Sequence, residues 1–459
     1  FYYNFIEEGL LRQIYVDWRT RHPPRSPMNY PFLFHAGVKS MLMHTEARLQ
    51  QETAVVQTIL GVQHQGFLSQ VVQEEHLQFG APQGDVKRSA MGDFNGVAGV
   101  PIPEQKTTPF LVLNVRRDNL LEDTLSALSG QRIVDLYKPL KVVFLGEEGL
   151  DWGGVRKEFF ALVVEKLLEP ELGIFTCNNV SNTVFFNKNC LEADSTFVLL
   201  GLLVSLSIYN ETILDLKFSP VIYKKLLGLD VDLEDLKTVD PQLASSLQNI
   251  LGWSEGVAEE VGLTFTVDTD YYGMAQVTEL CANGENTLVT TENKDAYVHL
   301  CVDFWLNRAT QRMFDPFLMG FNTLCDNPVL SMCTPSELEI LICGEPHLDF
   351  EALRKVTEYS DGYTADSEQV LWLWEILLQE FTAEQRKQFL FFCTGADRAP
   401  IGGLGKLRFI VQRSESDSDH LPSAHTCFNV LSLPAYSSKA KLSKLLSLAI
   451  SNAQGFGFI

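Results

Sequence analysis

Cys427 lies in a segment whose residue types suit a reactive nucleophile. His425 and Thr426 precede it, and an apolar, strand-like run over residues 430–433 follows. The thiolate is the reactive form of cysteine, and its fraction depends on nearby charge and on exposure. In an extended segment His425 and Cys427 would share a face, so the imidazole could favour the thiolate. The pattern predicts a covalent nucleophile, with an ordinary buried cysteine at the start of a strand as the open alternative.

A cysteine hydrolase is a second alternative for this thiol. Papain-like hydrolases place the catalytic histidine after the cysteine in the chain and orient it with Asn or Asp. All nine histidines of this chain precede Cys427, so the required order is absent. Nothing else in the sequence supports a hydrolase, and it stays the weaker reading.

The bulk composition predicts a globular protein of two to four domains. The chain has 459 residues, 46% of them hydrophobic and 20% charged. Its net charge of −22 argues against nucleic-acid partners and anionic membrane surfaces, and favours attraction to a basic protein. The longest apolar run, residues 197–209, is too short to span a bilayer. Because the chain begins with Phe1 rather than Met, we expect it to be part of a longer protein.

The nine cysteines argue against a disulfide framework and against a metal site. They are odd in number, widely spread, and contain no C-x-x-C pair. Free thiols suit a reducing compartment, so we expect a cytoplasmic location. We expect no metal and no other cofactor.

The elements that must position Cys427 can be read from periodicity and capping signals. Residues 31–78 have a helical pattern, and residues 79–108 are rich in Gly and Pro, which predicts a linker. Further strands are predicted over 110–115, 142–146, 407–412 and 427–433, and further helices over 119–128, 154–168 and from 438 onward.

Two helices carry strong start signals. Thr334-Pro335-Ser336-Glu337 is a capping box that opens a helix ending at Gly344, and Thr382 opens another that ends near Gly395. Pro346 follows the first helix closely, between two well-patterned regions. Gly344 and Pro346 are therefore a candidate hinge between domains.

Several of these motifs are similar to those of HECT-type ubiquitin ligases. The resemblance covers residues 110–459 in order, and it is carried by residues 149–160, 292–294, 338–344, 394–403, 421–429, 433–439 and 455–459. It implies an α+β, bilobal fold. A large, mainly helical N-lobe contains a small conjugating-enzyme-binding subdomain, and a hinge joins it to a small α/β C-lobe. The implied boundaries are 1–108 for an N-terminal extension and linker, 109–343 for the N-lobe, about 240–330 for its subdomain, 344–349 for the hinge and 350–459 for the C-lobe.

The resemblance also implies a reaction and its partners. Cys427, flanked by His425 and Thr426, would accept ubiquitin from a conjugating enzyme as a thioester and pass it to lysine amines of protein substrates. Phe456 matches a phenylalanine needed for the second transfer. A catalytically silent module of the same fold is a further alternative.

The implied conjugating-enzyme groove is centred on Tyr297. Leu247, Val261 and Leu300 would lie nearby, although Val261 is smaller than the residue expected in such a groove. The alternative is that these four residues belong to the hydrophobic core.

Overall fold

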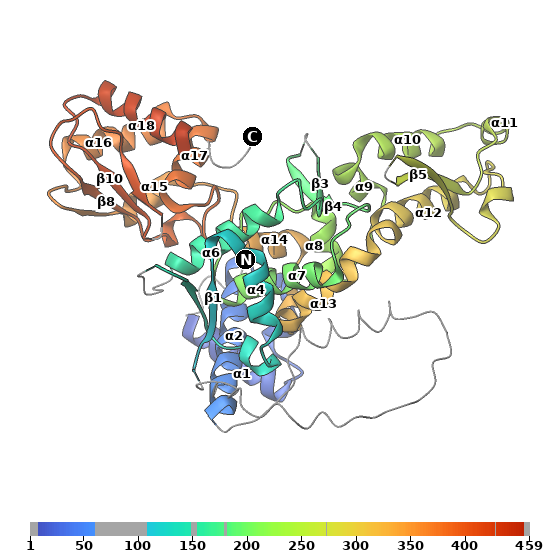
Figure 1. Ribbon diagram of the computed structural model, residues 1–459, viewed down its shortest axis with the longest axis horizontal. Coiled ribbons are helices and arrows are strands. Elements are labelled where there is room, and N and C mark those ends of the chain that lie inside the picture. The colour runs from blue at the N-terminus through green and yellow to red at the C-terminus, as the bar shows by residue number, and fades with distance from the viewer. Residues whose placement is uncertain are drawn as a thin grey trace, which may run out of the picture.

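The computed structural model describes residues 8–59, 108–147, 154–178, 181–271, 273–426 and 428–453. It has two lobes with separate hydrophobic cores. One core links buried residues between Leu11 and Cys343, and the other links buried residues between Phe350 and Ile450. Figure 1 shows the small lobe at one end of the molecule. The expected α+β, bilobal fold is confirmed.

The large lobe is built around two long helices that cross at its centre. In α7, Asp194–Tyr209, nearly every side chain is buried, and α13, Gln311–Cys325, packs along it. The surrounding helices are α4 Leu120–Ser129, α5 Ile133–Leu136, α6 Gly154–Leu167, α8 Pro220–Leu226 and α14 Pro335–Cys343. Two small sheets complete this lobe, with the parallel strands β1 Leu111–Val115 and β2 Leu140–Phe144, and the antiparallel strands β3 Phe175–Asn178 and β4 Thr183–Phe186.

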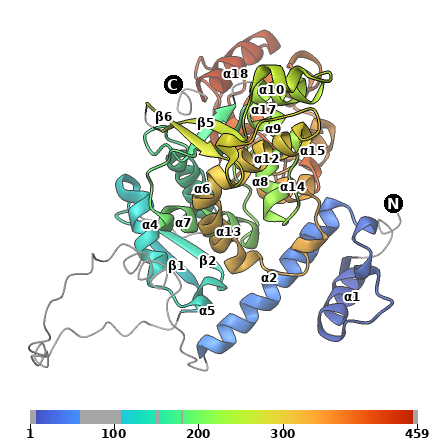
Figure 2. The same ribbon diagram turned by 90° about the vertical axis from the view of Figure 1, so that its right-hand side faces the viewer.

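The N-terminal segment packs on the large lobe through a long helix. Sequence analysis did not predict α1, Glu8–Arg21, while α2, Ala36–Ile59, covers part of the predicted helical region 31–78. Figure 2 shows α2 running diagonally across this lobe. Lys39 Nζ lies 2.6 Å from Glu337 Oε2, which ties α2 to the start of α14. The predicted linker over residues 79–108 lies, except for Thr108, outside the described residues.

A subdomain projects from the large lobe on the side opposite the small lobe (Figure 1). We call residues 228–306 the arm. Its elements are α9 Leu233–Val239, α10 Pro241–Leu251, α11 Val257–Val261, the antiparallel strands β5 Thr266–Tyr271 and β6 Met274–Glu279, and α12 Lys294–Leu306.

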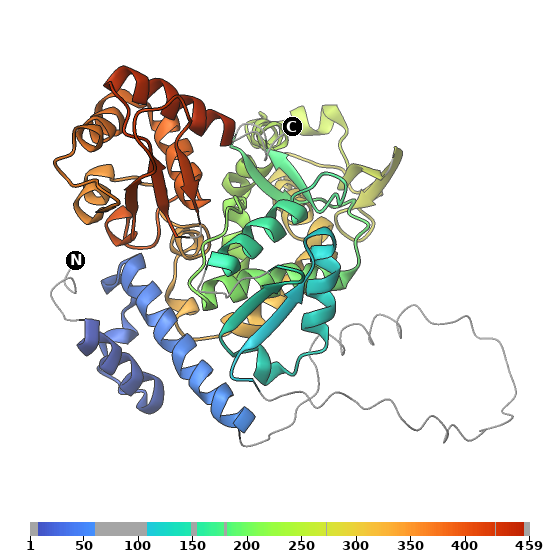
Figure 3. The same ribbon diagram turned by 60° about the vertical axis from the view of Figure 1, so that its left-hand side comes forward.

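The small lobe is a four-stranded sheet packed with helices (Figure 3). The strands lie in the order β7-β8-β10-β9, with β7, β8 and β10 parallel and β9 antiparallel. Their bounds are β7 Glu358–Ser360, β8 Ile410–Arg413, β9 Ser423–His425 and β10 Val430–Leu433. The helices are α15 Phe350–Val356, α16 Glu368–Glu375 with the π-helical turn Ile376–Glu380, α17 Ala383–Thr394 and α18 Lys439–Ala453.

Among the described residues, no helix combines the length and the hydrophobicity that crossing a bilayer requires.

Candidate catalytic site and partner surfaces

The position of Cys427 is framed by two strands of the small lobe. β9 pairs with β10, so that His425 lies opposite Val430 and Ala424 opposite Leu431. Cys427 itself lies outside the described residues, and its neighbours mark the place. The N–H of Phe428 donates to the carbonyl of His425 at 3.1 Å, which closes a turn between the strands. This turn presents the segment at the surface, because His425, Thr426 and Phe428 are all exposed.

The strand predicted over 427–433 is wrong at its start. β10 begins at Val430, and Thr426, Phe428 and Asn429 belong to the turn. Asn429 has a φ of 53°, which bends the chain out of the extended conformation, and its Nδ2 donates to the Arg408 carbonyl at 3.1 Å. β9 ends at His425, and Thr426 already belongs to the turn. The extended conformation that we assumed for residues 425–427 is therefore not continued at Thr426.

Most of the other cysteines are enclosed by the fold. Of the eight described cysteines, six are buried and Cys281 is half-buried, which leaves Cys177 as the exposed one. Burial raises the pKa of Cys343 to about 11 and that of Cys333 to about 12. Cys343 is also held in place, since its thiol donates to the Leu216 carbonyl at 3.0 Å. A thiol with such a pKa is almost entirely protonated at neutral pH and reacts slowly.

The loop after α17 joins the region around Thr426 to the large lobe. α17 ends at Gly395 in a left-handed conformation, and a methyl group added at Gly395 would lie 3.9 Å from Thr426 Cβ. Two residues later, Asp397 Oδ2 lies 3.0 Å from Lys217 Nζ of the large lobe. Arg398 then places Nη1 2.8 Å from Glu339 Oε1 on α14. The loop thus begins close to the turn beside Cys427 and forms ion pairs with the large lobe.

Charged groups at this lobe interface are partly buried. Burial raises the pKa of the Asp215 carboxyl, and the nearby Lys217 ammonium opposes that shift. Burial also disfavours the charged form of Lys217. The attraction of the Asp215 and Asp397 carboxylates is larger than this effect and raises the pKa of Lys217. Lys217 is therefore a cation shared between a carboxylate of each lobe.

Gly344 lies where the two lobes meet. It ends α14 with a φ of 81°, and a methyl group added to it would lie 2.5 Å from the Ala399 carbonyl oxygen. The next residue, Glu345, exchanges two backbone hydrogen bonds with Ala399, at 2.8 and 2.9 Å. Pro346 is exposed. The capping box predicted at Thr334 opens α14 as expected, with Glu337 at its third position.

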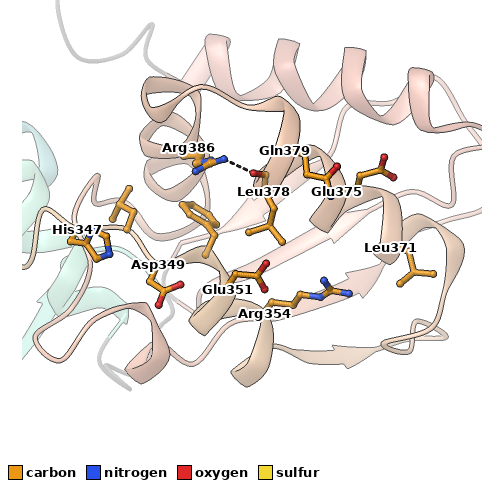
Figure 4. A pocket seen from close by; sticks show the side chains of 11 residues that line it. His347, Asp349, Glu351, Arg354, Leu371, Glu375, Leu378, Gln379 and Arg386 are labelled. Atoms are coloured by element: carbon orange, nitrogen blue, oxygen red, sulfur yellow. Dashed lines mark hydrogen bonds between the residues drawn. The ribbon is translucent and has the colours of Figure 1, made fainter.

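A hollow of about 620 Å³ opens directly after Pro346 (Figure 4). His347 and Asp349 line it from the segment between the lobes, and Glu351 and Arg354 line it from α15. On its other side Arg386 donates to the carbonyls of Leu377 and Leu378, at 2.7 and 2.6 Å, and so supports the π-helical turn. The lining of the hollow therefore includes both acidic and basic side chains.

The four predicted groove residues are divided between core and surface. Leu247 and Tyr297 are 3% and 7% exposed, and the Tyr297 ring packs edge-on against Phe265 at 5.5 Å between centroids. Leu300 is half-buried, while Val261 at the end of α11 is 52% exposed. All four belong to the arm, and Val261 is the one most available to a partner. Tyr297 and Leu247 belong to the hydrophobic core, which was the alternative interpretation of these residues.

Within the described residues, no group of three or more His, Cys, Asp or Glu side chains is arranged to hold a metal ion. Phe456 lies outside those residues.

Comparison with known proteins places the chain among ubiquitin transferases. The model of the family described as HECT-domain (ubiquitin-transferase) matches residues 161–459. The chain is 34% identical to the probable E3 ubiquitin-protein ligase HERC4 of Homo sapiens, in an alignment that covers 100% of this chain and 42% of HERC4. It is 37% identical to the probable E3 ubiquitin-protein ligase HERC3 of Homo sapiens, covering 93% of this chain and 38% of HERC3.

A shorter relative matches with similar identity. The probable E3 ubiquitin-protein ligase HECTD2 of Mus musculus is 39% identical, over 76% of this chain and 46% of its own length. The chain thus spans less than half of each of these relatives.

Proposed function

The chain belongs to the HECT-domain (ubiquitin-transferase) family, and on that premise we propose that it acts as an E3 ubiquitin-protein ligase through Cys427. Its partners would be ubiquitin, a ubiquitin-conjugating enzyme and protein substrates with accessible lysines. Within this family the whole sequence resembles the apoptosis-resistant E3 ubiquitin-protein ligase, and that narrower assignment stays a prediction. A cytoplasmic location is likewise proposed from the free thiols.

The proposed reaction has two transfers. The Cys427 thiolate attacks the thioester carbonyl at the C-terminus of ubiquitin, a new thioester forms, and the cysteine of the conjugating enzyme leaves as a thiolate. A substrate lysine, as the free amine, then attacks the Cys427 thioester and forms an isopeptide bond, and the Cys427 thiolate and one proton of the amine are released. The first transfer exchanges one thioester for another, so the chain's main task there is to position the reactants.

One observation carries the assignment of the nucleophile. The turn on either side of Cys427 is exposed, with Phe428 62% accessible, whereas most of the other cysteines are buried. A thiol in this turn can meet a bulky partner such as ubiquitin. His425 and Thr426 directly precede Cys427 in the sequence, and we propose that these two residues influence the reactivity of its thiol. Phe456 is proposed to support the second transfer.

We propose that Gly344 and Pro346 form the hinge between the lobes, near residues 344–349. The separate cores on either side support this boundary, since few apolar contacts would have to break for the lobes to turn. The arm is proposed to bind the conjugating enzyme, with Val261 at its surface and with Tyr297, Leu247 and Leu300 supporting that surface from within or partly within the core.

A thioester assay tests the function. The chain is incubated with activating enzyme, conjugating enzyme, ubiquitin and ATP, and the products are separated without reductant. We expect an adduct of one ubiquitin that reductant removes. Cys427→Ala should abolish it, and Cys427→Ser should give a reductant-resistant ester. Cys177→Ala is the control that should keep it, because Cys177 is the exposed thiol among the described cysteines.

The contrary outcomes are distinct. An adduct that survives in Cys427→Ala would move the nucleophile elsewhere. Absence of any adduct across a panel of conjugating enzymes would favour a silent module of the same fold. Cleavage of ubiquitin chains would favour a hydrolase.

A further inference from the structure

The loop between β8 and β9 contains three serines that alternate with acidic residues. Its residues 414–419 read Ser-Glu-Ser-Asp-Ser-Asp. Acid-directed serine kinases have a cationic substrate groove and select an acidic side chain three positions after the serine. Two serines of the loop have this spacing, because Asp417 follows Ser414 and Asp419 follows Ser416 at that distance. The spacing alone therefore does not distinguish between them.

The structure makes two of the three serines poor phosphate acceptors. Ser418 Oγ donates to Glu415 Oε1 at 2.7 Å, and the residue three positions after Ser418 is the apolar Leu421. The N–H of Ser414 donates to the Leu433 carbonyl at 3.2 Å, which holds this serine beside the end of β10. A kinase would have to break that backbone contact to draw Ser414 into its groove.

Ser416 is the accessible serine of the loop. It is exposed, lies outside any helix or strand, and its hydroxyl has no hydrogen-bond partner among the described residues. The acidic side chain that a kinase would select for Ser416, Asp419, is 95% exposed. The corresponding side chain for Ser414, Asp417, is 43% exposed and accepts the Ser437 N–H at 3.0 Å. Both the hydroxyl and the selecting carboxylate of Ser416 can thus be reached in the folded lobe.

We propose that Ser416 is a phosphorylation site for an acid-directed serine kinase. The Ser416 hydroxyl oxygen attacks the γ-phosphorus of ATP and forms a new phosphorus–oxygen bond. The bond from that phosphorus to the bridging oxygen breaks, and ADP and the hydroxyl proton are released. The phosphate adds a charge of about −1.5 to −2 at neutral pH. This site is separate from the proposed thioester chemistry at Cys427 and does not depend on it.

The phosphate also changes how the loop is held against α18. Lys441 Nζ, in the first turn of that helix, lies 2.9 Å from Asp417 Oδ1 and 3.0 Å from Asp419 Oδ1. The hydrogen bonds from Asp417 and Asp419 raise the pKa of Lys441, so it stays charged at neutral pH. A phosphate on Ser416 competes with both carboxylates for this ammonium and repels them. The phosphorylated loop is therefore anchored less firmly through Asp417.

The test uses the whole chain as the substrate of casein kinase II, an acid-directed serine kinase, with ATP. Ser416→Ala is compared with Ser414→Ala, which also removes one exposed hydroxyl of the loop. Asp419→Asn is compared with Asp118→Asn, which removes one exposed carboxylate of the large lobe. The rate of phosphate incorporation is measured, and mass spectrometry locates the modified residue.

We expect phosphate on Ser416, nearly none in Ser416→Ala, and an almost unchanged rate in Ser414→Ala. Asp419→Asn should slow the reaction roughly fivefold to tenfold, and Asp118→Asn should leave it unchanged. Loosening of the loop in Asp419→Asn would favour modification, so a slower reaction reports recognition of the carboxylate. No incorporation, phosphate on Ser414 in place of Ser416, or an unchanged rate in Asp419→Asn would overturn the proposal.

Hydrogen exchange tests the altered anchoring. Exchange at the Ser437 amide, which donates to Asp417, should be faster in the phosphorylated chain than in the unmodified chain. Ser416→Ala treated with the same kinase is the control and should show no acceleration. Equal exchange in the modified and unmodified chains would overturn the proposed change in anchoring.

Discussion

At the scale of single residues, Lys225 shows how a half-buried cation is accommodated in the large lobe. It lies on α8, donates to the Leu306 carbonyl at 2.7 Å, and sits 4.2 Å from the centre of the Phe314 ring. Burial lowers its pKa to about 8, although distant Asp315 and Asp303 act in the opposite direction. Its neighbour Lys224 pairs with Asp235 at 2.6 Å, and that hydrogen bond raises its pKa. Two adjacent lysines therefore differ in how they respond to pH.

This contrast gives a pH-dependent prediction. Between pH 8 and about 10.5, Lys225 is largely protonated in the unfolded chain and largely neutral in the folded chain. The free energy of unfolding should therefore increase as the pH rises through this range. Relative to Lys225→Met, the wild type should gain up to about 3 kcal/mol over this range, since one pKa unit is about 1.4 kcal/mol. Lys224→Met is the control and should show no such gain. Denaturant unfolding at several pH values measures both, and a constant difference for Lys225→Met would contradict the pKa shift.

At the scale of elements, the crossing of α7 and α13 sets the geometry of the large lobe. A methyl group added at Gly201 would lie 1.9 Å from the Phe317 carbonyl oxygen, and one added at Gly320 would lie 2.0 Å from that of Val198. The helices therefore touch backbone to backbone through a reciprocal pair of glycines. The segment after α7 carries Asp215 and Lys217 to the lobe interface, so this crossing also helps to place the contact with the small lobe.

Adding a single methyl group at this crossing should be strongly destabilising. Neither carbonyl can move away without displacing its helix, so Gly201→Ala should lower the free energy of unfolding by roughly 3 kcal/mol or more. Gly130→Ala is the matched control. Gly130 has a φ of −81° and nothing closer than 3.9 Å to an added methyl group, so its change should stay within about 1 kcal/mol. Equal stability of the two variants would show that the helices can separate at little cost.

At the scale of the whole molecule, the lobes are joined by few but specific contacts. Glu345 and Ala399 form a backbone pair, and Gly402 N–H donates to Glu345 Oε1. Two ion pairs, Arg398–Glu339 and Lys217–Asp397, join the same loop to the large lobe. These contacts hold the loop that begins at Gly395, close to Thr426. We therefore expect the docking of this loop to influence the turn beside Cys427.

Removing the partly buried cation should loosen the docked arrangement. Arg398→Ala leaves Glu339 and the Gly344 carbonyl without this donor, and a cost of about 2 kcal/mol corresponds to roughly thirtyfold faster opening. Hydrogen exchange at the amides of Glu345 and Ala399 should accelerate accordingly. Arg408→Ala, which removes an exposed pair with Glu358 inside the small lobe, should leave these amides unchanged. Unaltered exchange in Arg398→Ala would mean that the backbone pair alone holds the loop.

Features that depend on neighbours in sequence could be read from the sequence itself. The capping boxes at Thr334 and Thr382 each join residues three positions apart, and both open helices as predicted. The helix over 154–168 and the strand over 110–115 follow from the local spacing of apolar residues, and each is observed to within one residue. The motif around Cys427 is equally local. Local patterns therefore predicted these elements and the candidate nucleophile, and the family resemblance that the motifs carry predicted the fold class.

The tertiary structure alone decided which distant residues meet. Lys217 and Asp397 are 180 positions apart and form an ion pair. Gly201 of α7 lies against the backbone of Phe317 of α13, which is also far from it in the sequence. The burial of Tyr297, the exposure of Val261 and the turn that replaces the predicted start of β10 also depend on packing against other segments. Local spacing carries no information about these contacts, because each is set by how whole elements pack. Residue types and motifs in the sequence thus point to Cys427 as the proposed nucleophile, whereas the arrangement of the two lobes and of the loop between them emerged only from the fold.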